Sequence, residues 1–500
     1  MDILSNLALG FSVALSLENL SICFLGTLIG TLVGVLPGLG PIATIAMLLP
    51  ITYYLTPTGA IIMLAGIYYG AQYGGSTTAI LVNMPGESSS VVTCIDGHAM
   101  AKQGRAGPAL AVAALGSFFA GTVATGLVAA GTDTLLAVAN KFSSPEYFSL
   151  VVFGLVGSVV LAQGSIIKAL MMILLGLLLG FAGTDLSTAS LRYTFGVSEL
   201  SDGIGFVPIA MGLFGVSEII LNLEQRMRDG ATVAPIHSMW PTRDDIRRTV
   251  PAVLRGTALG SILGVLPGGG AVLSSFAAYA LEKRTSRTPQ RFGKGAIEGV
   301  AAPEAANNAG AQTSFIPLLI LGIPSNAVLA LLGGAMTIHG LAPGPQIAKE
   351  QPELFWGVIA SMWIGNLMLV IINLPLIGIW VRLLKVPYRL LFPVILFICS
   401  IGVYSVNNSA FEILLTVGFG FLGYLFRKLK CEMQPLLMAY ILAPLFEENL
   451  RRSMMLSHGD PSIFINRPVS AGLLIAAAGL LVILVVPAIK RGRQVAFQED

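Results

Sequence analysis

Long apolar stretches alternate with short polar segments along most of this chain. Residues 19–86 contain no Asp, Glu, Lys or Arg, and residues 305–348 form a second charge-free run. A helix needs about 20 apolar residues to cross the hydrocarbon of a bilayer, so each run has room for more than one crossing. The pattern therefore predicts membrane-spanning helices in both halves of the sequence.

Other apolar stretches predict further crossings, which together indicate an all-α polytopic membrane protein with about 10 to 12 transmembrane segments. The further candidate spans are 108–130, 147–163, 168–181, 204–221, 250–266, 354–374, 388–403, 411–426 and 469–489. Prolines and paired glycines are expected to break the helices of the first charge-free run. These expected breaks are Pro37-Gly38, Pro41, Pro50, Pro57 and Gly74-Gly75.

The composition supports a membrane location. Hydrophobic residues make up 55% of the 500 residues and charged residues only 11%, against roughly a quarter charged in soluble domains. The net charge of +3 is too small to predict a nucleic-acid partner. The four cysteines have no CxxC spacing, so we expect them to be packing residues rather than disulfides or metal ligands.

Basic residues gather in a few short segments between the apolar stretches. Because short cytoplasmic loops are enriched in Lys and Arg, we place these segments on the cytoplasmic side, together with a polar linker at residues 222–248. The basic clusters are Lys102/Arg105, Arg243/Arg247/Arg248, Lys283/Arg284/Arg287/Arg291/Lys294, Arg427/Lys428/Lys430 and Lys490/Arg491/Arg493.

One sequence motif occurs twice. Gly30-Thr-Leu-Val-Gly-Val-Leu-Pro-Gly-Leu-Gly40 returns as Gly260-Ser-Ile-Leu-Gly-Val-Leu-Pro-Gly-Gly-Gly270, and both copies read GxxxGxxPGxG. Downstream, the apolar rise to Pro85-Gly86 has a counterpart in the rise to Pro324-Ser325. Self-similarity of this length indicates an internal duplication. It gives a first half at residues 1–221, with broken helices at about 20–130 and scaffold helices at about 145–221. The second half covers residues 249–500, with broken helices at about 250–348 and scaffold helices at about 354–489.

Corresponding loops of the two copies differ in charge. Residues 53–57 are uncharged, whereas their counterpart at 282–287 is strongly basic. Conversely, the basic Lys102/Arg105 loop corresponds to residues 339–345, which contain no Lys or Arg. Loops on opposite sides of a membrane differ in this way, so we interpret the halves as inverted repeats. Two halves with the same orientation are the alternative.

Inverted repeats with Gly- and Pro-interrupted helices at matching positions are typical of secondary transporters, which alternate access around a midplane site. Non-helical backbone at membrane depth is tolerated where it lines a cavity. The GxxxG segments alone also fit close helix packing.

Polar residues gather beside the Pro-Gly breaks of both halves. Broken helices offer free N–H groups, which hold carboxylates without a fixed cation. We therefore expect an organic anion to bind between the halves. For any single Ser or Thr, the alternative is a hydroxyl bonded back to its own helix. The expected substrate-binding residues are Gly38, Gly40, Ser76, Thr77, Thr78, Gly268, Gly269, Gly270, Thr313, Ser314, Ser325 and Asn326.

Few acidic residues fall at membrane depth, where a carboxylate is a functional candidate. Glu304 is the best candidate for a cation-linked carboxylate, whereas Glu87 and Asp96 flank a turn and could be interfacial. No GxxxxGK[ST] phosphate loop is present, so we expect a cation gradient rather than ATP to drive the protein. Neutral oxygens favour sodium over a proton, and no other metal or cofactor is expected. The expected cation-binding residues are Asn83, Glu304, Asn307 and Asn308.

The chain resembles the large membrane subunit (TctA type) of the tripartite tricarboxylate transporter family. The resemblance rests on the duplicated motif, on Tyr69-Gly-Ala-Gln-Tyr-Gly-Gly-Ser76 and on Asn83-Met-Pro-Gly-Glu87. It continues through Ala302-Pro-Glu-Ala-Ala-Asn-Asn-Ala309 and Leu321-Gly-Ile-Pro-Ser325, and covers most of the chain. It implies a bacterial inner-membrane importer of organic carboxylates such as citrate. It also implies a small membrane subunit and a periplasmic substrate-binding protein as partners.

Two other classes of membrane protein fit the sequence less well. An intramembrane enzyme needs converging titratable residues, such as paired Asp or a Ser/His pair, and the four histidines are dispersed; we expect no enzymatic activity. A channel is expected to show rings of charge or a filter built from several subunits, which an inverted duplication within one chain does not predict.

Overall fold

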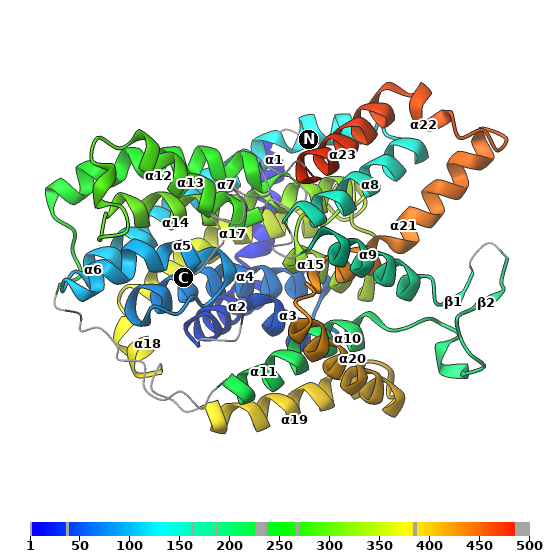
Figure 1. The fold of residues 1–500 in the computed structure, drawn as a ribbon, viewed down its shortest axis with the longest axis horizontal. Coiled ribbons are helices and arrows are strands. Elements are labelled where there is room, and N and C mark those ends of the chain that lie inside the picture. Colours follow the sequence, from blue (N-terminus) through cyan, green and yellow to red (C-terminus); the bar gives the residue numbers. More distant parts are fainter. Residues whose placement is uncertain are drawn as a thin grey trace.

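The structure is a computed structural model that describes residues 3–36, 40–161, 165–185, 188–225, 236, 238–266, 270–383 and 388–485. Helices dominate these residues, as Figure 1 shows. The strands β1 (Gly183–Thr184) and β2 (Leu191–Arg192) form a small antiparallel hairpin at one edge of the molecule. The predicted all-α fold class is thereby confirmed.

The first half contains long helices and a chain of short ones that follows α4. Its elements are α1 (Ile3–Ala14), α2 (Leu17–Val35), α3 (Pro41–Thr52), α4 (Pro57–Val82), η1 (Ser88–Ser90), α5 (Val91–Thr93), η2 (Cys94–His98), α6 (Ala99–Lys102), α7 (Ala106–Ala139), α8 (Ser144–Leu161), α9 (Ile166–Gly180), η3 (Ser198–Leu200), α10 (Phe206–Ala210), η4 (Met211–Val216) and α11 (Ser217–Gln225).

The second half repeats the order of three helices followed by a short segment, although its second and third helices have the same length. Its elements are α12 (Arg243–Gly264), α13 (Gly270–Thr285), η5 (Pro289–Arg291), α14 (Glu298–Thr313), η6 (Pro317–Leu321), α15 (Ala327–Ile338), α16 (Ile347–Glu350), α17 (Pro352–Asn373), α18 (Ile377–Leu383), α19 (Tyr388–Asn407), α20 (Ala410–Lys428), α21 (Gln434–Leu456), α22 (Ile463–Asn466) and α23 (Pro468–Val485).

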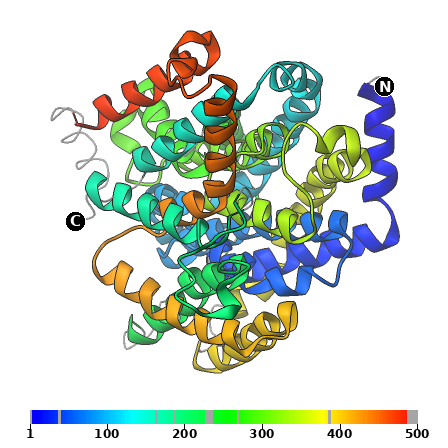
Figure 2. The ribbon, with the colours of Figure 1, turned by 90° about the vertical axis from the view of Figure 1, so that its right-hand side faces the viewer.

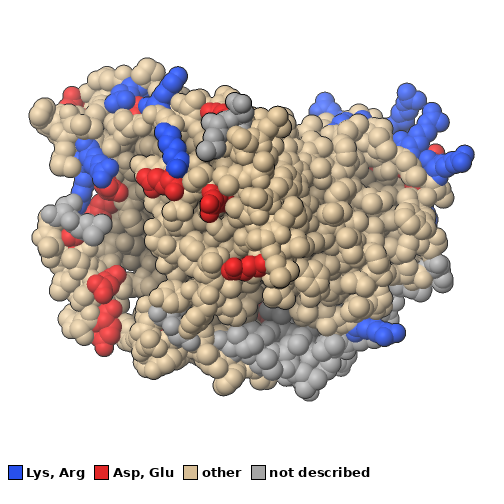
Figure 3. Space-filling view, turned by 180° about the vertical axis from the view of Figure 1, so that it is seen from behind, with Lys and Arg blue, Asp and Glu red and all other residues tan. Residues whose placement is uncertain are grey.

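Four helices in the described part of the chain, α2, α7, α17 and α20, are long and apolar enough to cross a membrane. Shorter apolar helices accompany them at Ile3–Ala14, Pro41–Thr52, Ser144–Val159, Ile166–Gly180, Phe206–Leu221, Ala327–Ile338 and Pro468–Val482. Figure 3 shows most Lys and Arg toward the two sides of one face, and the area between them is largely free of Lys and Arg but contains a few Asp and Glu side chains. This distribution suits a protein whose middle lies in hydrocarbon.

Prolines and glycines act differently along the first charge-free run. Pro41 and Pro57 begin α3 and α4, where a missing N–H costs nothing. The breaks predicted at Pro50 and at Gly74-Gly75 are wrong, because α3 continues through Pro50 and α4 runs without interruption to Val82. A Cβ at Gly74 would lie 2.4 Å from the carbonyl oxygen of Thr31, so this glycine allows α2 to approach α4. The predicted break at Pro37-Gly38 lies outside the described residues.

Helix α21 is not among the spans that the hydrophobic pattern predicts. It is 23 residues long, and its C-terminal part carries Glu447, Glu448, Arg451 and Arg452. Charged side chains there form ion pairs with one another and with the β-hairpin segment, such as Arg192 with Glu447. Because these charges lower the hydrophobicity of the segment, the hydrophobic pattern does not predict a span here, although the helix continues through them.

The glycines of the duplicated motif pack helices together in both halves. A Cβ at Gly30 of α2 would lie 2.4 Å from the carbonyl oxygen of Ile67 in α4. A Cβ at Gly260 of α12 would lie 2.3 Å from that of Ala306 in α14. Close packing, the alternative interpretation of GxxxG, is what these glycines provide.

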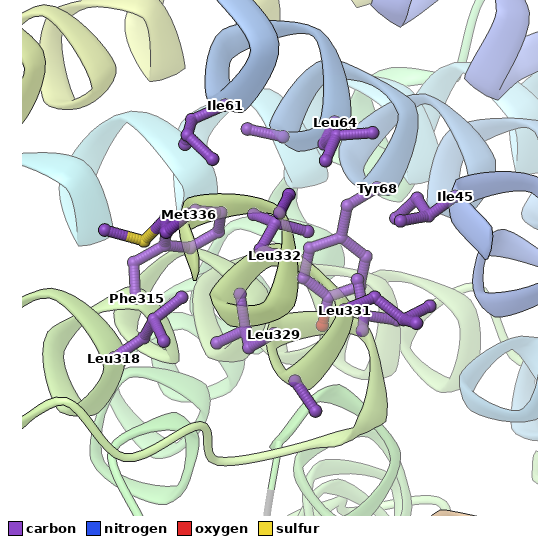
Figure 4. Packing of buried hydrophobic residues seen from close by; sticks show 14 of the residues in the cluster. Ile45, Ile61, Leu64, Tyr68, Phe315, Leu318, Leu329, Leu331, Leu332 and Met336 are labelled. Carbon is purple, nitrogen blue, oxygen red and sulfur yellow. The ribbon is translucent and has the colours of Figure 1, made fainter. Parts of the chain in front are cut away.

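The two halves share one apolar core. Figure 4 shows Leu329, Leu331, Leu332 and Met336 of α15 packed among side chains of the first half, including Ile61, Leu64 and Tyr68 of α4 and Ile45 of α3. Scaffold helices also pair across the halves: α9 approaches α21 at Gly176, and η4 approaches α20 at Gly212. In Figure 2, α1 stands at one edge beside α17, far from the last helix. The halves therefore form one interlocked body.

Candidate substrate and cation site

Two turns at corresponding positions lie beside the contact between the halves. Asn83 ends α4 and Gly322 ends η6, both with left-handed backbone, at φ 57° and 74°. Each turn then passes a proline and reaches an extended residue, Glu87 or Asn326, which caps the next helix. The predicted correspondence between the two Pro turns is thus visible in the backbone.

Glu304 lies at the centre of the contact between α14 and the first half. Its side chain is 1% exposed. The Ser76 hydroxyl of α4 donates to Oε2 at 2.6 Å, and the Thr93 hydroxyl of α5 donates to Oε1. No Lys or Arg pairs with Glu304 in the part of the chain that the structure describes. Two hydroxyl donors alone offset little of the cost of burying a negative charge, so this site suits a proton or a small cation.

A polar network continues from Glu304 towards α7. The Ser117 hydroxyl of α7 donates to the main-chain carbonyl of Glu304 at 3.4 Å, and the Asn308 amide donates to the Ser117 oxygen at 2.7 Å. Beside this network lies a cavity of about 10 Å³. That volume holds about one water molecule, so a tricarboxylate does not fit in this conformation. The cavity lining includes Tyr73, Ser76, Thr77, Ser117, Glu304 and Asn373.

Glu87 forms a second carboxylate contact between the halves. Its Oε1 accepts hydrogen bonds from the Ser89 hydroxyl and, at 3.3 Å, from the amide of Asn307 in α14. Asn307 lies one helical turn after Glu304 and is fully buried. The expected site residues do not include Glu87, although it ends the Asn83–Glu87 sequence on which the family resemblance partly rests. Thr93 and Ser117 were also not predicted, and no sequence signal distinguishes them from other hydroxyl residues.

Most hydroxyls expected to bind substrate donate to main-chain carbonyls. Thr77 donates to Tyr73, Thr78 to Val35, Thr313 to Ala309 and Ser325 to Ser314, at 2.9–3.3 Å. The Ser314 hydroxyl contacts the carbonyls of Gly310 and Gly264. These hydrogens are engaged in this conformation. Thr77, Thr78, Thr313 and Ser314 each contact a carbonyl one turn earlier in α4 or α14, as the alternative for single Ser and Thr residues expects, whereas the acceptor of Ser325 lies in another segment.

The remaining predicted residues lie at helix ends. Gly40 caps α3, and a Cβ there would have open space around it. Gly270 begins α13 with a φ of 44°, close to Asn326. Asn326 caps α15 through its Oδ1 and points its amide nitrogen at Tyr68, 3.5 Å away. Asn83 lies at the exposed end of α4. Gly38, Gly268 and Gly269 lie outside the described residues.

Several buried polar groups near this centre have no hydrogen-bond partner among the described residues. They are both amide atoms of Gln72, the Tyr69 hydroxyl, Asn307 Oδ1 and Gln312 Oε1. Buried polar atoms are usually paired, so their concentration on α4 and α14 marks a place where a polar ligand or ion can bind. Within the described residues the cysteines are free, and no group of three or more His, Cys, Asp or Glu residues is placed to hold a metal.

Asp96, which the sequence leaves as an interfacial candidate, is buried and bonded across the halves. Its Oδ1 accepts three backbone N–H bonds, from Gly293, Gly295 and Ala296, at 2.8–2.9 Å. Its Oδ2 accepts the Tyr279 hydroxyl at 2.9 Å. These contacts join η2 to the segment between α13 and α14, which gives Asp96 a structural role.

Comparison with known proteins agrees with this architecture. The sequence matches the family described as "Tripartite tricarboxylate transporter TctA family" over residues 20–438. It is 57% identical over 500 residues, the whole of both chains, to an Agrobacterium vitis protein described as "Uncharacterized 52.8 kDa protein in TAR-I ttuC' 3'region". It is 54% identical over 241 residues to "Uncharacterized protein in TAR-II ttuC' 3'region" of the same organism, covering 48% of this chain and 100% of that protein. No solved structure matches it. The chain is therefore a membrane protein that belongs to the tripartite tricarboxylate transporter TctA family, a family of transporters.

Proposed function

We propose that this chain is the large membrane subunit of a cation-coupled importer of organic di- and tricarboxylates such as citrate. The observation that carries the proposal is the environment of Glu304, a buried carboxylate of one half held by hydroxyls of the other. Such a carboxylate needs a proton or a cation to be stable. Binding and release of that cation would change the contacts between the halves. A symporter requires such a link between cation binding and the movement that transports the substrate.

The proposed substrate site lies between the halves, at Gly38–Gly40 and residues 76–78 of one and at Gly268–Gly270 and residues 313–326 of the other. The N-terminus of α3 at Gly40 and that of α15 at Asn326 offer N–H groups to carboxylates. The cavity beside Glu304 is too small for the substrate, which supports a closed conformation. We propose that the halves are inverted repeats and that their relative movement provides this alternating access.

The proposed coupling ion is sodium, with a proton as the alternative. Asn83, Glu304, Asn307 and Asn308 are its proposed ligands, because carboxylate and amide oxygens suit a small hard cation. The sodium ion is proposed as the one cofactor of transport, and the chain is proposed to catalyse no chemical reaction.

The proposed partners follow from the tripartite character of the family. A small membrane subunit would assemble with this chain in the bacterial inner membrane, where it crosses the bilayer many times. A periplasmic binding protein would deliver the carboxylate substrate.

Uptake of radiolabelled carboxylates into proteoliposomes tests the proposal. This chain and the small membrane subunit are reconstituted, and the periplasmic binding protein is added. Uptake is measured with an inward sodium gradient, with a proton gradient, and with neither. We expect uptake that needs a cation gradient and the binding protein. Glu304→Gln is expected to abolish accumulation, whereas Glu448→Gln, at a side chain 51% exposed, is expected to leave uptake unchanged. Undiminished uptake after both gradients are collapsed would contradict cation coupling.

A further inference from the structure

Glu87 is more exposed than Glu304. It caps η1 at the turn that follows α4 and is only half-buried, whereas Glu304 is enclosed. The turn itself is open, with Asn83 and Pro85 exposed and Met84 43% exposed. An ion can therefore reach Glu87 without unpacking the helices around Glu304.

Among the described residues, the carboxylate of Glu87 has polar partners but no Lys or Arg partner. Both of its hydrogen bonds fall on Oε1, from Ser89 and from the Asn307 amide. Residues 19–101 and 295–348, which supply α4, η1 and α14, contain no Lys or Arg. Helix α13, which also packs against η1, carries Lys283 and Arg284 in its last turn, and neither forms an ion pair with Glu87 in the described part of the chain. A half-buried carboxylate without a protein cation favours a mobile one.

Asn307 supplies the second, independent observation. It is 0% exposed, its Nδ2 points at Glu87, and its Oδ1 has no partner among the described residues. A carboxamide can turn over about its last side-chain torsion, which exchanges the donor for the acceptor. Turned over, Asn307 would present Oδ1 to an ion held by Glu87. Its Nδ2 would then lose Glu87 as an acceptor, and the contact between Oδ1 and the ion would replace that hydrogen bond.

The corresponding turn of the second half carries no charge. Asn326 occupies the place of Glu87, with nearly the same backbone conformation (φ −154°, ψ 173° against φ −148°, ψ 166°), and it too caps the helix that follows. A substrate carboxylate near Asn326 meets helix N–H groups, whereas one near Glu87 meets a negative charge. Neutralising Glu87 would remove this repulsion and let an anion bind between the turns.

We propose that Glu87 and Asn307 form a sodium site at the turn after α4, with Ser89 as a further oxygen ligand. This site neutralises the one charged turn before the carboxylate substrate binds, and it thereby couples sodium to substrate. The inference rests on the proposed transport function and deepens it: Glu87, reachable from outside the helix bundle, is the entry ligand for the coupling ion, while Glu304 acts deeper between the halves.

Direct binding of 22Na⁺ to the purified full-length chain tests the site without any substrate. Binding is measured by scintillation proximity at constant pH and ionic strength, with choline as the replacement cation. Glu87→Gln preserves the size of the side chain and is expected to weaken sodium binding roughly ten- to a hundredfold, as the loss of a charge-assisted contact does. Asn307→Ala is expected to weaken it by a smaller factor. The exposed Glu448→Gln is the matched control and should bind sodium like the wild type.

Substrate transport separates this inference from the proposed function. Carboxylate counterflow, measured with equal sodium on both sides, is expected to persist in Glu87→Gln but to lose its dependence on sodium concentration. Sodium binding by Glu87→Gln and Asn307→Ala that matches the wild type would overturn the site, even if the wild type imports carboxylates. A wild-type chain that binds no sodium, yet transports with protons, would also overturn the site and leave the proposed transport function standing. If Glu87→Gln fails to fold, Ser89→Ala decides, because Ser89 contacts Glu87 and is not among the proposed ligands around Glu304.

Discussion

Gly34 and Gly264 occupy corresponding positions of the duplicated motif, and each touches the backbone of the helix beside it. A Cβ at Gly34 would lie 2.3 Å from the carbonyl oxygen of Ala71, and one at Gly264 would lie 2.4 Å from that of Gly310. The same spacing of contacts therefore joins α2 to α4 and α12 to α14. These two closely packed helix pairs, called the frames below, hold the polar residues of the site: Ser76 on α4 and Glu304 on α14.

Substitution of the packing glycines is expected to separate these frames. Gly34→Ala and Gly260→Ala place a methyl group within 2.4 Å of a backbone carbonyl, so α2 or α12 must move. Overpacking of this kind costs about 1–3 kcal/mol, and a lower midpoint of thermal unfolding in detergent is expected for both variants. Gly126→Ala in α7, where a Cβ meets nothing within 4 Å, is the matched control and should not lower it. Equal midpoints for all three variants would argue against the packing role.

The sequence predicts the frames better than it predicts the site. The duplicated motif, the charge-free runs and the Pro turns locate the central helices because these signals are local. The contacts of Glu304 are not local: Ser76 and Thr93 lie 228 and 211 residues away. The sequence does single out Glu304 and Asn307, because polar residues in an apolar helix are conspicuous. It gives no reason to select Thr93, or to choose Glu87 over Asp96, until the short helices after α4 fold back against α14.

Loss of the Ser76 hydroxyl is expected to impair transport through Glu304. Ser76→Ala removes the donor to Oε2 and leaves Thr93 on Oε1. A hydrogen bond to a charged group contributes about 1.5–3 kcal/mol, so transport at limiting cation concentration is expected to fall roughly ten- to a hundredfold. Thr77→Ala, whose hydroxyl donates to its own helix, is the neighbouring comparison and should change transport less. A Ser76→Ala variant with wild-type dependence on cation concentration would place the cation elsewhere.

The ion pair between Asp245 and Arg105 is expected to make stability depend on pH. Burial acts to raise the pKa of Asp245, but hydrogen bonds from Arg105 and Thr242 outweigh burial and hold this pKa below its ordinary value. A lowered pKa stabilises the folded state above the unfolded value of about 3.9, and the contribution is lost as the pH falls through the folded pKa. The unfolding midpoint of Asp245→Asn should therefore lie below that of the wild type at pH 7, and the gap should narrow below about pH 4. If the difference between the two unfolding midpoints stays constant down to pH 3, the lowered pKa of Asp245 is not its cause.

The proposed inverted arrangement of the halves predicts opposite exposure of two loops. The uncharged loop at residues 53–57 and the basic segment at 283–294 are corresponding parts of the two halves. Single cysteines at Tyr54, which is 70% exposed, and at Arg287 are to be labelled in intact cells with a membrane-impermeant maleimide. We expect labelling at position 54 only, with position 287 reacting after the cells are permeabilised. Equal labelling of both positions in intact cells would mean that the halves share one orientation.

Asp96 is expected to hold η2 of the first half to the segment before α14 through its charge as well as its shape. Three N–H groups and the Tyr279 hydroxyl converge on its buried carboxylate, a geometry that favours an anion. Asp96→Asn keeps an acceptor oxygen but loses the charge, so each bond weakens. Asp96→Ala leaves the N–H groups of Gly293, Gly295 and Ala296 without their acceptor; those of Gly295 and Ala296 are buried, and each buried unpaired donor costs about 1–3 kcal/mol. The midpoint of thermal unfolding is therefore expected to fall in the order wild type, Asn, Ala. The exposed Asp202→Asn is the matched control and should unfold with the wild type. If Asp96→Ala unfolds at the wild-type temperature, these contacts contribute no net stability, and the halves are held together by their apolar core and their other polar contacts.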